Sequence, residues 1–123
     1  MTQACKHAPR SPRQAVRRRG PLDRALDPVL LKALAEPARA RLFACVAKCG
    51  RPCSVSEVAA CCDADFSTVA RHLSTLARAG ALEARKEGRT VWYEARSADL
   101  ASRFRAIADA IERPTGACGC RPD

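Results

Sequence analysis

The spacing of apolar residues along the chain predicts a protein built mainly from helices. Apolar residues recur at helical intervals over residues 26–34, which indicates a first amphipathic helix. Pro37 fits the first turn of a second helix, and Gly50 followed by Pro52 marks its end. The apolar face of this second helix consists of Leu42, Phe43 and Val46.

Two further helices joined by a short turn are expected next. Ser54 and Glu57 have the spacing of a capping box, so a third helix should begin at Val55. Asp65 can cap a fourth helix, which Gly80 ends. The inner stripe of the fourth helix consists of Val69, Leu73, Leu76 and Ala77. Two such helices in succession predict a helix-turn-helix.

After Gly80 the helical pattern gives way to alternation. Residues 81–96 alternate β-forming and charged residues around Glu87 and Gly88, which predicts a hairpin with a basic tip. A last helix opens at Ser97 and carries an apolar stripe wider than one small core needs. We therefore expect a mainly helical fold with a small β-hairpin, a winged helix-turn-helix with flanking N- and C-terminal dimerisation helices. The residues expected at the dimer interface are Leu30, Leu34, Leu100, Phe104, Ile107 and Ile111.

Basic residues are concentrated at the start of the chain. Residues 1–21 hold six of the nine net positive charges, contain no acid, and are interrupted by proline and glycine. We expect a disordered basic tail over residues 1–21, a DNA-binding and dimerisation domain over 22–112, and a flexible cysteine-containing tail over 113–123. The charge suggests a polyanionic partner, nucleic acid before membrane. Without an apolar run fit for a membrane span or a signal peptide, the expected location is the cytoplasm.

The polar face of the fourth helix suits contact with DNA. Short hydroxyl side chains, an arginine and a histidine match the phosphates and base edges of a major groove. The expected contacts from this helix are Ser67, Thr68, Arg71, His72 and Thr75. The hairpin is expected to bind flanking phosphates through Arg85, Lys86 and Arg89. The alternatives are an ordinary solvated helix face, a merely charged hairpin and, for His72, a structural or metal-binding role.

Three segments in order resemble the ArsR/SmtB family of bacterial metal-responsive repressors. They are an L-x-x-P-x-R motif within LAEPARARLF, an R-H-L-x-x-L-x-x-A-G motif in the fourth helix, and an R-x-x-G-R-x-x-x-Y motif in the hairpin. The resemblance covers about residues 26–112, and the combination is specific although each element alone is common. It implies a homodimer that binds a palindromic operator when metal-free and releases it when an inducer binds.

Eight cysteines and only two histidines indicate what is sensed. In a reducing compartment clustered thiols favour metal binding or redox chemistry over a disulfide framework, and a thiolate-rich site selects soft ions. The expected ligands are Cys53, Cys61 and Cys62, possibly joined from the tail by Cys118 and Cys120. For Cys45 and Cys49, which share a helix face, we favour simple burial, and Cys5 is interpreted as incidental.

The inducer sites known in the resembled family do not match this chain. The C-x-C-x-x-C ligands of the archetypal arsenite-responsive members correspond here to Ser54, Ser56 and Ala59, and the last helix lacks the histidine of the zinc site. As(III) is the first expected inducer, because it forms three bonds and three sulfurs fit it, with Hg(II), Cd(II) or Pb(II) behind. One objection is that Cys53 lies about two helical turns, roughly 11 Å, from Cys61 and Cys62, so joining them requires that helix to bend.

Three other functions are compatible with parts of this sequence. The same fold suits a thiol-based redox-sensing repressor in which a cysteine is oxidised and no metal takes part. A metal-buffering carrier would not need a recognition helix. A thiol enzyme would need a histidine or carboxylate beside its nucleophilic cysteine, and the sequence suggests none, so we expect no enzymatic activity.

Overall fold

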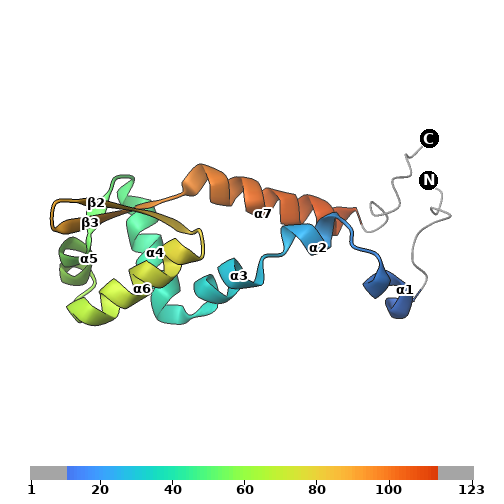
Figure 1. Cartoon of the computed structure of the whole chain (residues 1–123), viewed down its shortest axis with the longest axis horizontal. Coiled ribbons are helices and arrows are strands. Elements are labelled where there is room, and N and C mark those ends of the chain that lie inside the picture. Colours follow the sequence, from blue (N-terminus) through green and yellow to red (C-terminus); the bar gives the residue numbers. More distant parts are fainter. Residues whose placement is uncertain (1–10, 114–123) are drawn as a thin grey trace. The chain divides into compact units, whose positions relative to one another are not determined.

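The computed structural model describes residues 11–113. The expectations for residues 1–10 and 114–123, including those for Cys5, Cys118 and Cys120, lie outside the described residues. The chain divides into two compact units, one formed by Pro28–Leu100 and the other by Met1–Asp27 with Ala101–Asp123. Figure 1 shows the elements of both units along the chain.

The first unit contains the four helices that the sequence predicts, although the first begins at Pro28 and leaves Leu26 outside it, as the C-cap of α2 (Pro21–Ala25). These four helices are α3 (Pro28–Ala35), α4 (Pro37–Cys49), α5 (Val55–Cys61) and α6 (Phe66–Arg78). Gly50 ends α4 in the left-handed region, with φ of 67°. At the start of α5, the Glu57 amide donates to Ser54 Oγ at 3.2 Å, and the Ser54 amide donates to the Glu57 carboxylate at 3.0 Å. The predicted capping box is therefore confirmed.

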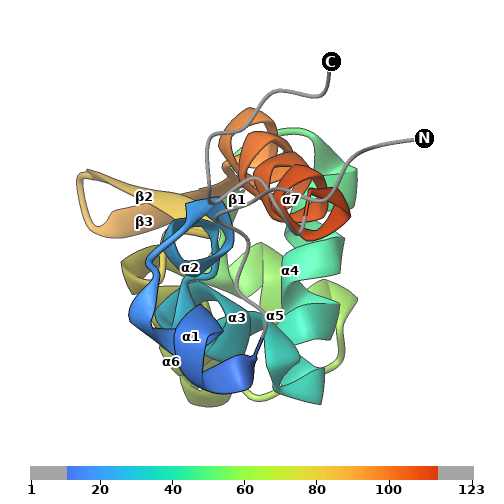
Figure 2. The ribbon, with the colours of Figure 1, turned by 90° about the vertical axis from the view of Figure 1, so that its right-hand side faces the viewer.

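An antiparallel sheet of three strands completes this unit. The strands are β1 (Cys53–Ser54), β2 (Leu82–Glu87) and β3 (Thr90–Ala95), in the order β1-β3-β2. Gly88, with φ of 64°, allows the tight turn between β2 and β3. Figure 2 shows this hairpin projecting beyond the helices as a wing. The winged helix-turn-helix prediction is confirmed, and β1 is an addition that the sequence did not indicate.

The core of this unit is centred on α6. Val69, Leu73 and Leu76 on its inner face are at most 1% exposed, and α6 packs against α3, α4, α5 and β2. Because helix and hairpin share this core, α6 and the wing are held in a fixed relation. The other fully buried large side chains are Leu30, Val46, Val58 and Leu82.

The second unit contains α1 (Pro12–Arg17), α2 (Pro21–Ala25) and most of α7 (Ser97–Glu112). Helix α1 lies in a segment predicted to be disordered. Its formation is explained by Ser11, whose side chain accepts from the Gln14 amide, and by Pro12, which is tolerated in a first helical turn. Arg103 of α7 pairs with Asp27 at 3.4 Å. Among residues 11–113, none of the helices combines the length and apolar character needed to cross a membrane.

The structure corrects two residues expected at the dimer interface. Leu30 and Leu100 are 2% and 4% exposed within the single chain and belong to its own core. Leu34 is partly buried against the same core. On α7 the expected residues Phe104 and Ile111 are exposed, and on α3 the exposed apolar side chain is Val29. Helical spacing identifies the apolar stripe of α3, but it does not show which edge of that stripe the rest of the chain leaves exposed.

Candidate DNA-binding surface and thiol pairs

Asp65 organises the N-terminus of α6. Its carboxylate accepts from the Thr68 amide at 3.0 Å, from Ser67 Oγ at 2.6 Å and from Thr68 Oγ1 at 3.1 Å. These hydrogen bonds hold the pKa of Asp65 below its usual value, so the carboxylate is charged at neutral pH. Both hydroxyl protons are committed to the cap. Ser67 and Thr68 can therefore offer DNA acceptor oxygens rather than donors.

The other predicted contacts on α6 differ in exposure and in the bonds that they make. Arg71 is exposed. Thr75 Oγ1 donates to the backbone carbonyl of Arg71 at 3.0 Å, so its proton is used within the helix. His72 is partly buried, with Nδ1 enclosed and without a hydrogen-bond partner, and its charge would act on Glu36 at the start of α4. This placement favours the structural role for His72.

Phe66 is a surface residue that sequence reasoning missed. It is the first residue of α6 and is 56% exposed, although it is large and apolar. Nothing in the core requires an aromatic ring at this position. The signal available in the sequence was an aromatic residue directly after the helix cap and outside the stripe that begins at Val69.

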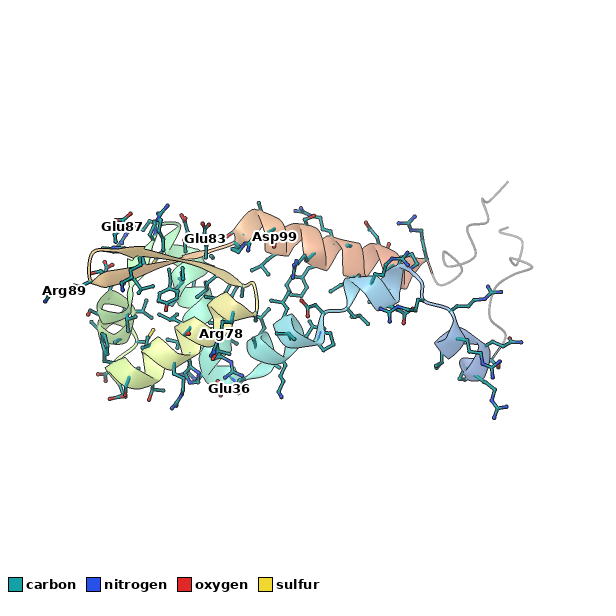
Figure 3. All side chains as sticks on the ribbon, viewed as in Figure 1. Glu36, Arg78, Glu83, Glu87, Arg89 and Asp99 are labelled. Atoms are coloured by element: carbon teal, nitrogen blue, oxygen red, sulfur yellow. The ribbon has the colours of Figure 1, made fainter. Side chains whose placement is uncertain are left out.

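The wing carries its basic residues on both faces. Arg85 pairs with Trp92 and Lys86 with Val91 in the strand register, so these two side chains point to opposite sides of the hairpin. Arg85 lies 3.7 Å from Glu87, an exposed ion pair. Arg89 extends from the outer end of the hairpin, away from the helices (Figure 3). The predicted basic tip is present, and Arg85 and Lys86 extend from opposite faces of the hairpin.

Five free cysteines of the first unit lie on α4, β1 and the end of α5. The pKa of Cys45 is raised by burial first and then by Cys62, the residue that caps the C-terminus of α5, with smaller effects of Cys49 and Cys61. The pKa of Cys53 in β1 is likewise raised by burial first and then by Cys49. Cys53 is 2% exposed, and its Sγ donates to the Arg51 carbonyl at 3.4 Å. Cys45 is partly buried, in line with the burial expected for it, whereas Cys49 is exposed and the expectation of burial is wrong for that residue.

The predicted set of Cys53, Cys61 and Cys62 is not gathered. Cys53 lies at one end of α5 and Cys62 at the other, and Cys61 is exposed. Within residues 11–113, no group of three or more His, Cys, Asp or Glu side chains is arranged to hold a metal ion. The separation along α5 that the sequence implied is therefore retained in the fold.

Burial keeps two of these thiols protonated. Desolvation, with a smaller contribution from the neighbouring thiol, raises the pKa of Cys45 and of Cys53 from 9.0 to about 11. The thiolate is the form that reacts with peroxide, so neither residue is suited to be the first target of an oxidant at neutral pH.

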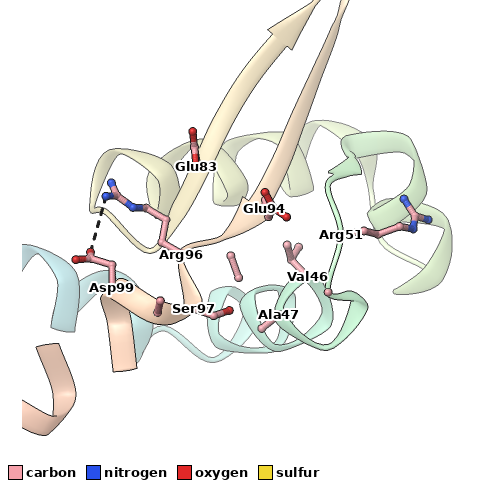
Figure 4. A pocket seen from close by; sticks show the side chains of 11 residues that line it. Val46, Ala47, Arg51, Glu83, Glu94, Arg96, Ser97 and Asp99 are labelled. Atoms are coloured by element: carbon pink, nitrogen blue, oxygen red, sulfur yellow. Dashed lines mark ion pairs between the residues drawn. The ribbon is translucent and has the colours of Figure 1, made fainter. Parts of the chain in front are cut away.

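An open cavity of about 410 Å³ lies beside the C-terminal end of α4. Figure 4 shows Glu83 and Glu94 on the outer face of the wing lining it, with the ion pair between Arg96 and Asp99 at one side. That pair spans 4.0 Å. Mixed charge around an open cavity suits water and small ions. Neither Cys45 nor Cys62 lines this cavity.

Comparisons with known proteins agree with this architecture. A family model described as a helix-turn-helix domain matches residues 34–85. No protein with a curated description matches the chain. A solved structure of a possible transcriptional regulator for arsenical resistance is 31% identical, with TM-score 0.56, over 70% of this chain and 85% of that one. HlyU, a transcriptional regulator from Vibrio vulnificus, is 30% identical, with TM-score 0.51, over 66% and 82% of the two chains.

A further relative was described in solution. A homodimeric winged helix-turn-helix DNA-binding domain from Mycobacterium bovis, described as a possible ArsR-family regulator, is 25% identical with TM-score 0.56. The match covers 86% of this chain and 91% of that one.

Proposed function

The chain belongs to the ArsR family of winged helix-turn-helix DNA-binding transcriptional regulators, which are not enzymes, and from this we propose that it is a cytoplasmic, homodimeric repressor. In this proposal the dimer releases its operator when a thiophilic metal or metalloid binds its cysteine thiolates. The observation that carries the proposal is the concentration of five free cysteines on α4, β1 and the end of α5, within and beside the helix-turn-helix.

Operator binding rests on α6 and the wing. Arg71 is the outward cation of α6, and a bidentate contact to a guanine edge is the commonest specific use of such a side chain. Arg85, Lys86 and Arg89 supply phosphate contacts from the wing. Ser67, Thr68 and Thr75 complete the proposed surface as acceptors, and His72 positions the helix.

Dimerisation rests on apolar side chains that the single chain leaves uncovered. Phe104 and Ile111 are exposed on α7, with the half-buried Ile107 between them. The Mycobacterium bovis relative is described as homodimeric. A two-fold dimer presents two recognition helices to two half-sites, which requires a palindromic operator.

As(III) is the first inducer to test, followed by Hg(II), Cd(II) and Pb(II). The donors are soft sulfurs, which favours thiophilic ions over hard cations. A three-sulfur As(III) site requires three thiols to be drawn together, with Cys61 or a tail cysteine among them. The alternative function, a redox-sensing repressor, relies instead on the exposed Cys49 and Cys61. The raised pKa values of Cys45 and Cys53 keep those two thiols protonated.

The proposal is tested by release of an operator. The operator is first selected from random DNA by repeated binding to the reduced, metal-free protein, and is then labelled for fluorescence anisotropy. Arsenite, Hg(II), Cd(II) and Pb(II) are titrated under full reduction, and peroxide is titrated separately. Release by at least one thiophilic ion supports the proposal. Release by peroxide alone would replace it with the redox reading, and failure to select any DNA would remove the repressor assignment.

A further inference from the structure

Another open cavity lies where α3, the start of α4 and the end of α6 meet. Its volume is about 300 Å³, at the small end of the range of ligand pockets in proteins. All of its lining residues belong to the unit formed by Pro28–Leu100, and none of them is a cysteine. The cavity is therefore separate from the thiols of the proposed inducer site.

Three of the seven residues that line this cavity are cations, and none is an acid. Lys32, Arg39 and Arg78 come from three different helices. Within residues 11–113, neither Lys32 nor Arg78 takes part in an ion pair. Glu36, the nearest acid along the chain, lies outside the lining, and its carboxylate accepts from the Arg39 amide at 2.9 Å. The lining is thus positively charged without compensation, which favours an anion.

The side chain of Arg39 is already held in place beside this cavity. Its Nε donates to the Ala33 carbonyl at 2.9 Å, which ties the start of α4 to the end of α3. This bond uses one of the five N–H donors of the guanidinium. Because the fold orients the group, an anion that binds to it loses little affinity to the ordering of this side chain.

The other walls of the cavity are apolar. Ala33 and Ala79 are 4% and 8% exposed, and Val29, 64% exposed, continues the apolar wall toward solvent. Lys32 and Arg78 are exposed residues, so their aliphatic stems add methylene groups to the lining while their charged ends reach solvent. A ligand that matches this lining has a compact apolar body and one negatively charged end.

We propose that this cavity binds a small amphipathic organic anion, a carboxylate on a compact apolar body. The apolar body packs against Val29, Ala33 and Ala79, and the carboxylate accepts from Lys32, Arg39 and Arg78. A DNA phosphate carries no apolar body to fill this lining, so a small molecule fits the cavity better than a duplex does.

Titration with 2-naphthoate and its neutral counterpart 2-naphthamide tests the site on the full chain. Each compound is added to reduced, metal-free, ¹⁵N-labelled protein, and amide chemical shifts are followed. We expect saturable shifts centred on residues 32–33 and 75–79 with 2-naphthoate, and binding of the amide weaker by about tenfold or more. Equal affinity for acid and amide, or the absence of saturable shifts at these residues, would overturn the proposal.

Variants that remove one charge identify the anion's partners. Lys32→Met and Arg78→Met keep an unbranched stem, so each should weaken 2-naphthoate binding by about tenfold and leave 2-naphthamide unchanged. Both positions are exposed, and circular dichroism verifies folding. Arg41→Met, at an exposed position of α4 outside the lining, is the matched control and should bind like the wild type. Wild-type binding of 2-naphthoate by both cavity variants would overturn the proposal.

Two other occupants would give different results. If the cavity contacts DNA instead, Lys32→Met and Arg78→Met weaken operator binding while 2-naphthoate leaves the cavity amides unshifted. If a second copy of the chain covers the cavity, the apparent affinity for 2-naphthoate falls as protein concentration rises. Either result would overturn the proposal. Charge-dependent binding of 2-naphthoate by a protein that selects no DNA would keep this site and refute the proposed function.

Discussion

Replacing Phe104 and Ile111 of α7 with serine should separate the proposed dimer while leaving each protomer folded. These side chains are 42% and 58% exposed in the single chain, so a partner would cover roughly half of each. Burying a whole side chain of this kind contributes about 1.5–3 kcal/mol, so covering half contributes on the order of 1 kcal/mol. A two-fold interface contains each residue twice. The double variant should therefore dimerise about 4 kcal/mol less favourably, roughly three orders of magnitude in Kd.

Sedimentation velocity over a wide range of protein concentrations measures this change. The wild type should sediment as a dimer at micromolar concentration, and the double variant as a monomer whose circular dichroism is unchanged. Arg105→Ser, an exposed polar position on the same helix, is the control and should leave the dimer intact. Leu100→Ala should show the opposite signature, a loss of about 2–5 kcal/mol in unfolding free energy, because Leu100 is buried within the chain. A double variant that remains dimeric would show that the apolar stripe of α7 is not the interface.

The remaining predictions concern DNA and the start of α5. Arg71→Ala should cost about 1–3 kcal/mol of operator affinity and relax base preference at one position per half-site, and unchanged binding would mean that α6 presents a different face. Lys86→Ala or Arg89→Ala should weaken binding to all sequences alike and reduce the slope of log affinity against log salt by about 1 per protomer, as a salt titration measures. Phe66→Ser should weaken binding mainly where the selected site carries thymine, because an exposed ring can pack on its methyl group; equal loss on thymine-free sites would contradict this. Ser54→Ala should lower the unfolding free energy by about 0.5–2 kcal/mol in urea denaturation through loss of the α5 cap, and no loss would mean the capping bond contributes nothing.

Most of the fold could be predicted from local signals, because these signals depend only on neighbouring residues. The cap at Ser54, the cap at Asp65 and the stop at Gly50 each involve contacts within a few positions, and all three occur as predicted. Strand β1 could not be predicted, since two residues leave no alternation and the strand exists only by pairing with Tyr93 and Trp92 of β3.

The surroundings of Cys45 and Cys49 depend on information that spacing does not contain. The sequence shows that Cys45 and Cys49 share a face of α4, but which element packs on that face is decided by the tertiary fold. The same limit explains why Leu30 was expected at an interface and is found in the core. A helical stripe identifies an apolar face without saying whether the same chain or a partner covers it.

If the protein acts as proposed, the opposite orientation of Arg85 and Lys86 on the wing constrains how an inducer frees the DNA. A hairpin that rolls about its long axis turns one cation away from the duplex while it brings the other toward it. The electrostatic attraction is then nearly unchanged, and the bound counterions are not recovered. Release must therefore come from withdrawal of the whole hairpin or from a changed distance between the two recognition helices. Inducer binding should accordingly change which spacings between the two operator half-sites the dimer can bind. It should not reorient the wing locally.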